Sequence, residues 1–347
     1  MFIYYQNLRK EIDVRQKWLE TVLTGEKKWI LENQGPEGEF YMNGSKAGDV
    51  NPYFACMAAL GLLAETKNCP ITETEKKAVG RYLDWHTGIL LETDGKMGIY
   101  RKESGKLIYK EKADSEDGYL GMYLFLMGKY LEKTESTDLP EYWKKGISLA
   151  LKKIQSLMQD GITQVSEENT TVYLMDNLEV WKGLYELEHA GLKDVQAIRE
   201  MRNKLQAQIE KLFWDDANQR WRIIENSDLY HQKEFYPDGV AQIYPLIYEF
   251  PVKEKKKQKI LYKQFTERFQ WQKLTKKRNG FLWAMTGMAA AQMGDINNLL
   301  EMIRNYEAEY CENRKYPLYT GEAGWICMEC EKLYSLYERK IKTGFLV

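Results

Sequence analysis

"ADSEDGYLGMYLFLMGKYL", residues 113–131, decides the fold, because a helix-length apolar run follows directly on a group of acids. The run has no polar face, and a helix that is apolar all round has to be buried on every side. Three carboxylates, Asp114, Glu116 and Asp117, stand just before it. Acids at a helix start cap the helix and oppose its dipole, but three within four residues exceed what capping needs. We therefore expect at least one of them to line a ligand site.

Five other segments share this character. They are residues 52–64, 174–190, 239–250, 281–293 and 323–330. Helices with a single apolar stripe, such as 143–157 and 194–214, stand between them. A repeat of helical hairpins is either an open solenoid or a closed ring, and a solenoid would expose one face of every helix. The six buried helices therefore predict an all-α (α/α)6 barrel, a toroid of six helical hairpins with an inner and an outer ring.

The loops between the helices carry the remaining pattern. No linker rich in Ser, Gly or Pro interrupts the repeat, so we expect a single domain over residues 1–347. Alternating residues predict a small β-hairpin at 96–110, around a Ser104-Gly105 turn, and residues 214–224 are expected to form a helix end, a turn and a strand.

Acids and aromatic residues recur where the buried helices begin. In a closed ring these beginnings meet at one end, so their side chains should converge on one funnel. The acids are Asp49, Asp114, Glu116, Asp117, Asp176, Asp238 and Glu322, and the aromatic residues include Tyr53, Tyr236, Trp283, Tyr319 and Trp325. Capping, a turn or dipole compensation explains each acid alone, but not their joint recurrence with aromatic rings.

A funnel of carboxylates and aromatic rings is the inventory of glycoside hydrolysis. One carboxyl has to hold a proton for the leaving oxygen, and an ionised one activates water or attacks. Crowding and burial drive the pKa values of such carboxyls apart, while Tyr and Trp faces stack on sugar rings.

The same motifs resemble those of the six-hairpin glycosidases, distantly the family-8 glycoside hydrolases and related clostridial-type glycosidases. In family 8 the first inner helix opens with a Glu four residues before a Tyr, and "DVNPY" places Asp49 four residues before Tyr53. "ADSEDGYLGMYLFLM", "FYPDGVAQIYPLIYEF" and "YTGEAGW" are similar to later segments of that superfamily. The resemblance implies an inverting mechanism.

We therefore predict a glycoside hydrolase that acts on an oligo- or polysaccharide by general acid/base catalysis. The proton donor is expected to be Asp114 or Glu116, with Asp49 as a competitor, and the base Asp238. The residues expected to hold the sugar are Tyr53, Asp117, Asp176, Tyr236, Trp283, Tyr319, Glu322 and Trp325. Two alternatives stay open: an inactive toroid that binds glycans or protein, and a sugar epimerase or polysaccharide lyase.

Composition limits the other possibilities. Formal net charge is −1, from 50 basic and 51 acidic residues, so no global field favours nucleic acid or an anionic membrane. No signal-peptide core or membrane-spanning run is visible, and five scattered cysteines fit a reducing compartment; we expect a cytoplasmic monomer unless a leader precedes this sequence. No cofactor motif or metal site is evident, because the "CMEC" cysteines at 327–330 lack further ligands nearby.

Overall fold

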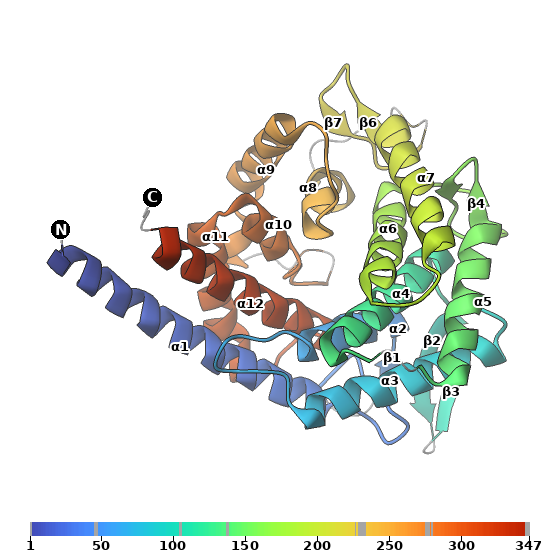
Figure 1. The fold of residues 1–347 in the computed structure, drawn as a ribbon, viewed down its shortest axis with the longest axis horizontal. Helices are drawn as coiled ribbons and strands as arrows, with labels where there is room; N and C mark the ends of the chain where they lie inside the picture. Colours follow the sequence, from blue (N-terminus) through green and yellow to red (C-terminus); the bar gives the residue numbers. More distant parts are fainter. Residues whose placement is uncertain are drawn as a thin grey trace.

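The computed structural model describes most of the chain. The ranges are 2–44, 48–103, 106–136, 139–225, 227, 234–274, 278 and 280–343, with side chains from residue 9 to residue 342. Two concentric sets of α-helices build these ranges (Figure 1). The inner helices are α2 (Pro52–Leu62), α4 (Glu116–Thr134), α6 (Leu174–His189), α8 (Val240–Ile247), α10 (Thr286–Met293) and α12 (Thr320–Thr343). The outer helices are α1 (Phe2–Glu32), α3 (Glu73–Glu92), α5 (Glu141–Leu157), α7 (Gln196–Phe213), α9 (Lys255–Phe269) and α11 (Ile296–Tyr306).

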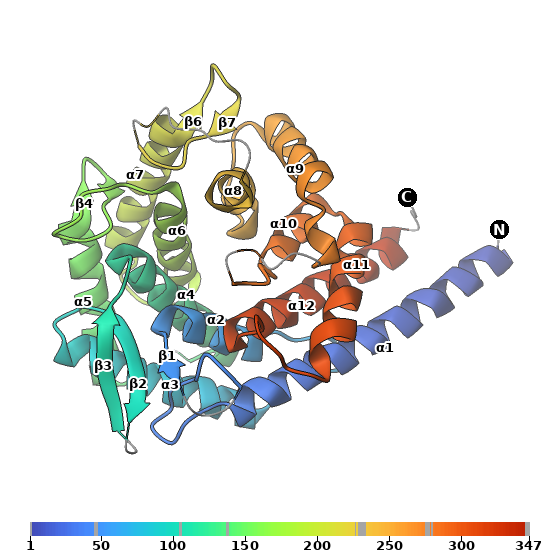
Figure 2. The same cartoon turned by 180° about the vertical axis from the view of Figure 1, so that it is seen from behind.

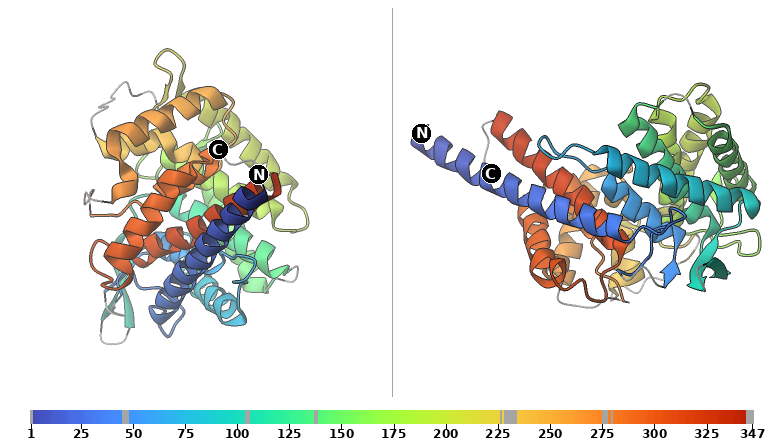
Figure 3. Two further views of the ribbon diagram at one scale, coloured as in Figure 1. Left: turned by 90° about the vertical axis from the view of Figure 1, so that its left-hand side faces the viewer. Right: turned by 90° about the horizontal axis from the view of Figure 1, so that it is seen from below.

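The inner helices form a closed ring. Each contacts the next in chain order, and α12 returns to pack against α2 (Figures 1 and 2). The outer helices pack on the ring, α7 on α6 and α9 on α8, for example. The long α1 lies along α12, and the two project together beyond the body (Figure 3). The predicted all-α toroid is therefore confirmed.

Glycines explain how closely the inner helices approach each other. A Cβ atom added to Gly183 of α6 would lie 2.3 Å from the carbonyl oxygen of Gly121 in α4, and one added to Gly61 of α2 would lie 2.4 Å from the Cα of Gly324 in α12. Only a residue without a side chain fits at such contacts. The glycines of the buried runs thus place backbones against each other around the ring.

The outer helices bury one stripe each, as their spacing predicts. In α7, Ile198, Leu205, Ile209 and Phe213 are buried while most other positions are exposed. Helix α3 begins with a capping box between Thr72 and Glu75, which satisfies two backbone amides at its start.

Short strands decorate the loops. A three-stranded antiparallel sheet is made of β1 (Asp49–Val50), β2 (Gly98–Glu103) and β3 (Lys106–Lys112), in that order. Two-stranded hairpins join β4 (Met158–Gln159) to β5 (Ile162–Thr163) and β6 (Trp214–Asp215) to β7 (Arg220–Trp221). The predicted strands within 96–110 are confirmed, and the turn residues 104–105 lie outside the described ranges. In 214–224 the predicted strand is β7, but the first two residues form β6 instead of a helix end, because α7 ends at Phe213.

Short irregular helices complete the chain. They are η1 (Phe235–Gly239), η2 (Trp271–Lys273) and η3 (Glu307–Cys311). Among the helices described, none is both long and apolar enough to cross a bilayer.

Ion pairs link the inner helices near their C-terminal ends. The buried Lys182 of α6 lies 2.8 Å from Glu186 and 2.9 Å from Glu249, just after α8. Glu249 also pairs with Lys332 of α12 at 2.5 Å, and Lys129 of α4 pairs with Glu186 at 3.3 Å. These groups form a charged plug that joins α4, α6, α8 and α12. The opposite end of the ring, where the inner helices begin, contains the cavity.

Candidate functional site

A cavity of about 520 Å³ opens where the inner helices begin. Its wall takes residues from the start of the ring helices, from the segment before α10 and from the β1–β2–β3 sheet. The predicted residues that line it are Asp49, Tyr53, Asp114, Asp176, Tyr236, Trp283, Glu322 and Trp325. Four other predicted residues, Glu116, Asp117, Asp238 and Tyr319, lie outside its lining.

Asp49 and Asp114 occupy the rim. Asp49 accepts hydrogen bonds from Arg101 Nε at 2.7 Å and Lys110 Nζ at 2.8 Å, and these cations hold the pKa of its carboxyl below the usual range. The cap of α2 is instead Asn51, which accepts the backbone amide of Tyr53 at 2.9 Å. The side chain of Asp114 is exposed.

The other two acids of the 113–131 stretch turn away from the cavity. Glu116 is buried and lies 3.2 Å from Lys112 Nζ. Asp117 is completely buried and accepts hydrogen bonds from the hydroxyls of Ser115 and Thr163, at 2.8 and 2.7 Å, so it ties α4 to β5. Burial raises the pKa of Asp117 to about 6. Ser115 is the N-cap of α4.

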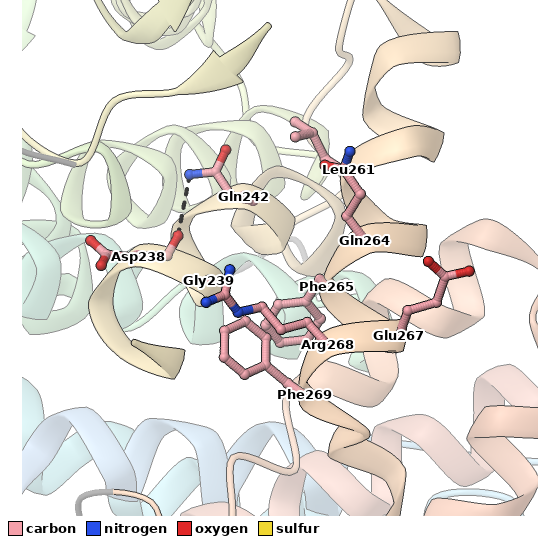
Figure 4. Close-up of a pocket in the computed structure, with 9 residues that line it drawn as sticks. All are labelled: Asp238, Gly239, Gln242, Leu261, Gln264, Phe265, Glu267, Arg268 and Phe269. Carbon is pink, nitrogen blue, oxygen red and sulfur yellow. Dashed lines mark hydrogen bonds between the residues drawn. The ribbon is translucent and has the colours of Figure 1, made fainter. Parts of the chain in front are cut away.

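Asp238 lines a different hollow, between α8 and α9. That hollow has a volume of about 470 Å³, and Asp238 shares it with Gln242, Arg268 and Phe269 (Figure 4). The amide nitrogen of Gln242 donates to the carbonyl oxygen of Asp238 at 3.2 Å. The structure therefore separates Asp238 from the acids of the central cavity.

Glu179 is a cavity residue that sequence reasoning missed. It lies on α6, three residues after Asp176 and thus on the same helix face. The hydroxyls of Tyr53, Tyr244 and Tyr248 all donate to its Oε1, the second at 2.6 Å and the third at 3.3 Å.

The environment of Glu179 favours a protonated carboxyl. Burial raises its pKa to about 7, although the three tyrosine hydroxyls favour the charged form. Its Oε2 receives no hydrogen bond from the described residues and packs against Gly118, where an added Cβ atom would lie only 2.6 Å from this oxygen. Burial and the charges of Asp117 and Glu179 raise the pKa of Asp176 well above its usual range.

Glu322 stands at the start of α12, across the ring from α6. Both of its oxygens are engaged: Oε1 accepts the backbone amides of Leu282 and Trp283, each at 3.1 Å, and Oε2 accepts that of Ala284 at 2.9 Å. Burial raises the pKa of Glu322 to about 7, against the amides, which favour the charged form.

Aromatic rings form much of the cavity wall. The ring centroid of Tyr53 lies 5.5 Å from that of Tyr119, and Trp283 lies 4.8 Å from Tyr236. The indole N–H of Trp325 is buried without a hydrogen-bond partner among the described residues. Tyr319 packs behind this wall, 5.5 Å from the ring of Phe281.

The described residues do not form a metal site in or around the cavity. Within the ranges described, no group of three or more His, Cys, Asp or Glu side chains has the geometry to hold an ion. Cys327 and Cys330 are buried in α12. The arrangement is thus one of carboxyls with raised pKa values, aromatic faces and hydroxyl donors.

Solved structures with a similar fold include two glycosidases and an isomerase. A variant of a glycosidase has a TM-score of 0.66 and 12% identity, over 93% of this chain and 98% of that one. A glycosidase variant in complex with glucose has a TM-score of 0.61 and 11% identity, over 94% and 98%. A D-mannose isomerase has a TM-score of 0.60 and 12% identity, over 92% and 97%. No protein-family model and no curated protein matches the sequence. The chain therefore has a glycosidase-like toroid fold.

Proposed function

We propose that this protein is a glycoside hydrolase whose substrate enters the cavity at the mouth of the toroid. The observation that carries the proposal is Glu179, a carboxyl with a raised pKa inside an aromatic-walled cavity. Glycosidases with the same fold, one of them bound to glucose, support a sugar as the ligand. The cavity volume of about 520 Å³ lies within the range of small-molecule binding sites, about 300–1,000 Å³.

Glu179 is the proposed proton donor. With a pKa of about 7 it still holds a proton in a large fraction of molecules at neutral pH, which a general acid requires. The tyrosine hydroxyls fix Oε1, and this leaves Oε2 as the oxygen that carries and delivers the proton.

Asp114 is the proposed base. Its side chain is exposed at the rim of the same cavity, where a water molecule can reach it. Asp176, one helical turn before Glu179, is proposed to bind a sugar hydroxyl. These roles replace Glu116 and Asp238 as catalytic candidates, because neither lines the cavity.

The test is hydrolysis of a panel of oligosaccharides by the protein and its variants. Glu179→Gln and Asp114→Asn should each lower kcat by about 100-fold or more, which is the usual contribution of a general acid or base. Asp238→Asn is the matched control and should keep kcat within about twofold, because Asp238 lines a different hollow from the proposed acid and base. Equal activity in Glu179→Gln and the unchanged protein would remove Glu179 from catalysis.

The anomeric form of the first product shows whether hydrolysis inverts or retains the configuration of the sugar. The resemblance to family 8 implies inversion, which requires room for a water between acid and base. Proton NMR of the first product formed should give the anomer opposite to that of the substrate. Retention would contradict the pairing of Glu179 with a water-activating base.

Sugar isomerisation is the second candidate, because a D-mannose isomerase shares the fold. Incubation of free hexoses with the protein tests it directly. Among the described histidines, His86 is buried in contact with Tyr82 and Cys56, and His189 lies at the end of α6. Neither lines the cavity, so the carboxyl chemistry of a hydrolase fits better. Turnover of free sugars without hydrolysis of any glycoside would reverse this choice.

A further inference from the structure

Trp283 has a backbone conformation that needs an explanation. Its φ is +59°, in the left-handed region that a residue with a bulky side chain rarely adopts. Such a conformation persists only where surrounding contacts impose it. Trp283 lines the cavity and is partly exposed there, so the contacts that impose its backbone also place its ring.

Glu322 makes the contacts that impose this backbone. Its carboxylate accepts three consecutive amides, those of Leu282, Trp283 and Ala284, and it is 5% exposed. Three consecutive amides that point at one carboxylate fix three successive peptide planes, and the last two of these planes flank Trp283. The three distances are those of ordinary N–H···O hydrogen bonds, and all three bonds end on one buried side chain.

The indole ring is then fixed by its own neighbours. Its Nε1 donates to the carbonyl oxygen of Arg278 at 2.9 Å. Its ring lies 4.8 Å from Tyr236 and 5.6 Å from Phe235. The carbonyl oxygen of Trp283 accepts both the amide and the hydroxyl of Thr286, at 3.0 and 2.8 Å, which joins the segment to the first turn of α10.

We propose that Glu322 is a positioning residue, which acts on the sugar through Trp283 by holding its indole ring as a wall of the cavity. The proposal rests on the proposed function, since it takes the cavity to be the sugar site. Glu322 has three of its acceptor positions occupied by backbone, so it holds the stacking surface and leaves proton transfer to other carboxyls. The substrate contact it controls is a sugar face stacked on the indole.

Kinetics of Glu322→Ala and Glu322→Gln test the role. Loss of a well-placed aromatic platform should raise KM about tenfold, equivalent to about 1.4 kcal/mol, with kcat within about threefold of the unchanged protein. Glu322→Gln keeps one carbonyl oxygen for the amides of Leu282 and Trp283, so its effect should be smaller. Glu338→Gln is the control, because it lies on the same helix about 24 Å further along the axis.

A double-mutant cycle shows whether the effect passes through the indole. If it does, Glu322→Ala should add little to KM in a Trp283→Ala background. Effects on KM that add fully would overturn the proposal, and so would a kcat collapse of 100-fold with KM unchanged, because that result would place Glu322 at the reacting atoms.

Amide hydrogen exchange provides a readout that needs no substrate. In Glu322→Ala, the amides of residues 282–284 should exchange faster while the amides of α4 keep their protection. Unchanged exchange at 282–284 would overturn the positioning role. If the protein hydrolyses no glycan, the proposed function fails. The exchange experiment still tests whether Glu322 fixes the backbone of residues 282–284.

Discussion

The pH profile of Tyr244→Phe tests the proposed acid most sharply. The hydroxyl of Tyr244 donates to Glu179 Oε1 at 2.6 Å and favours the charged carboxylate. A hydrogen bond to a charged group contributes about 1.5–3 kcal/mol, and about 1.4 kcal/mol corresponds to one pH unit. Because two other tyrosines keep their bonds to Oε1, we expect a change near the lower end of that range.

The sign of the change follows from the role of the carboxyl. Removal of a donor raises the pKa of Glu179 above its value of about 7, so the acid keeps its proton to higher pH. The basic limb of kcat/KM should therefore move upward by about one pH unit. At pH 8 the variant should retain about half of its maximum, while the unchanged protein retains about a tenth.

Two further tyrosine variants serve as comparisons. Tyr248→Phe removes a bond of 3.3 Å and should move the limb less. Tyr123→Phe removes a buried hydroxyl that bonds to Thr87 and does not touch Glu179, so its profile should not move. A basic limb that stays in place in Tyr244→Phe, with activity retained, would refute the assignment of Glu179 as the titrating acid.

Three other predictions concern stability. Gly183→Ala should lower the free energy of unfolding by about 2 kcal/mol, because an added Cβ would lie 2.3 Å from a backbone oxygen and this overpacking outweighs the gain in helix propensity. Gly88→Ala has open space around it and should raise the free energy of unfolding by up to about 1 kcal/mol. Calorimetry compares the two variants, and equal changes would contradict the close helix contact. Glu179→Gln should stabilise the fold by about 3 kcal/mol above pH 7 and by little below pH 4.5, because between these values the unfolded chain ionises Glu179 more easily than the folded protein does. Urea unfolding at several pH values measures the difference in stability between the variant and the unchanged protein. A difference that does not change with pH would count against a raised pKa of Glu179. Lys182→Met should destabilise the fold by about 1–3 kcal/mol, because Glu186 and Glu249 lose the buried cation between them while Lys129 and Lys332 still pair with them. No change in urea unfolding would mean that Lys182 is not held as described.

The helical framework was predictable because its signals are local. Apolar periodicity distinguished the fully buried helices from the amphipathic ones. Glycines such as Gly121 and Gly183 lie in the segments that this pattern predicts to be buried. The rule that inner helices begin at one end then brought Asp176, Trp283 and Glu322 to one cavity. These residues lie at the helix starts or just before them, where sequence position determines location well.

The assignment of individual acids was harder, for physical reasons. Asp114 and Asp117 are three residues apart, yet the start of α4 at Glu116 turns the second into the protein interior against Thr163. Asp238 lies in η1, where the backbone at Tyr236 leaves helical geometry, and its direction depends on that bend. Glu179 stands inside a helix, and the tyrosines that mark it come from α2 and α8, far away in sequence.

The charged plug affects how a ligand can reach and leave the cavity. Its ion pairs run from Lys129 on α4 to Lys332 on α12, across the end of the ring that lies opposite the cavity. In the proposed glycoside hydrolase, a glycan would therefore enter and leave by the mouth of the cavity, because the buried Lys182 and Glu186 lie toward the other end of the ring. Under that proposal, departure of the product and arrival of the next substrate would compete for the same route.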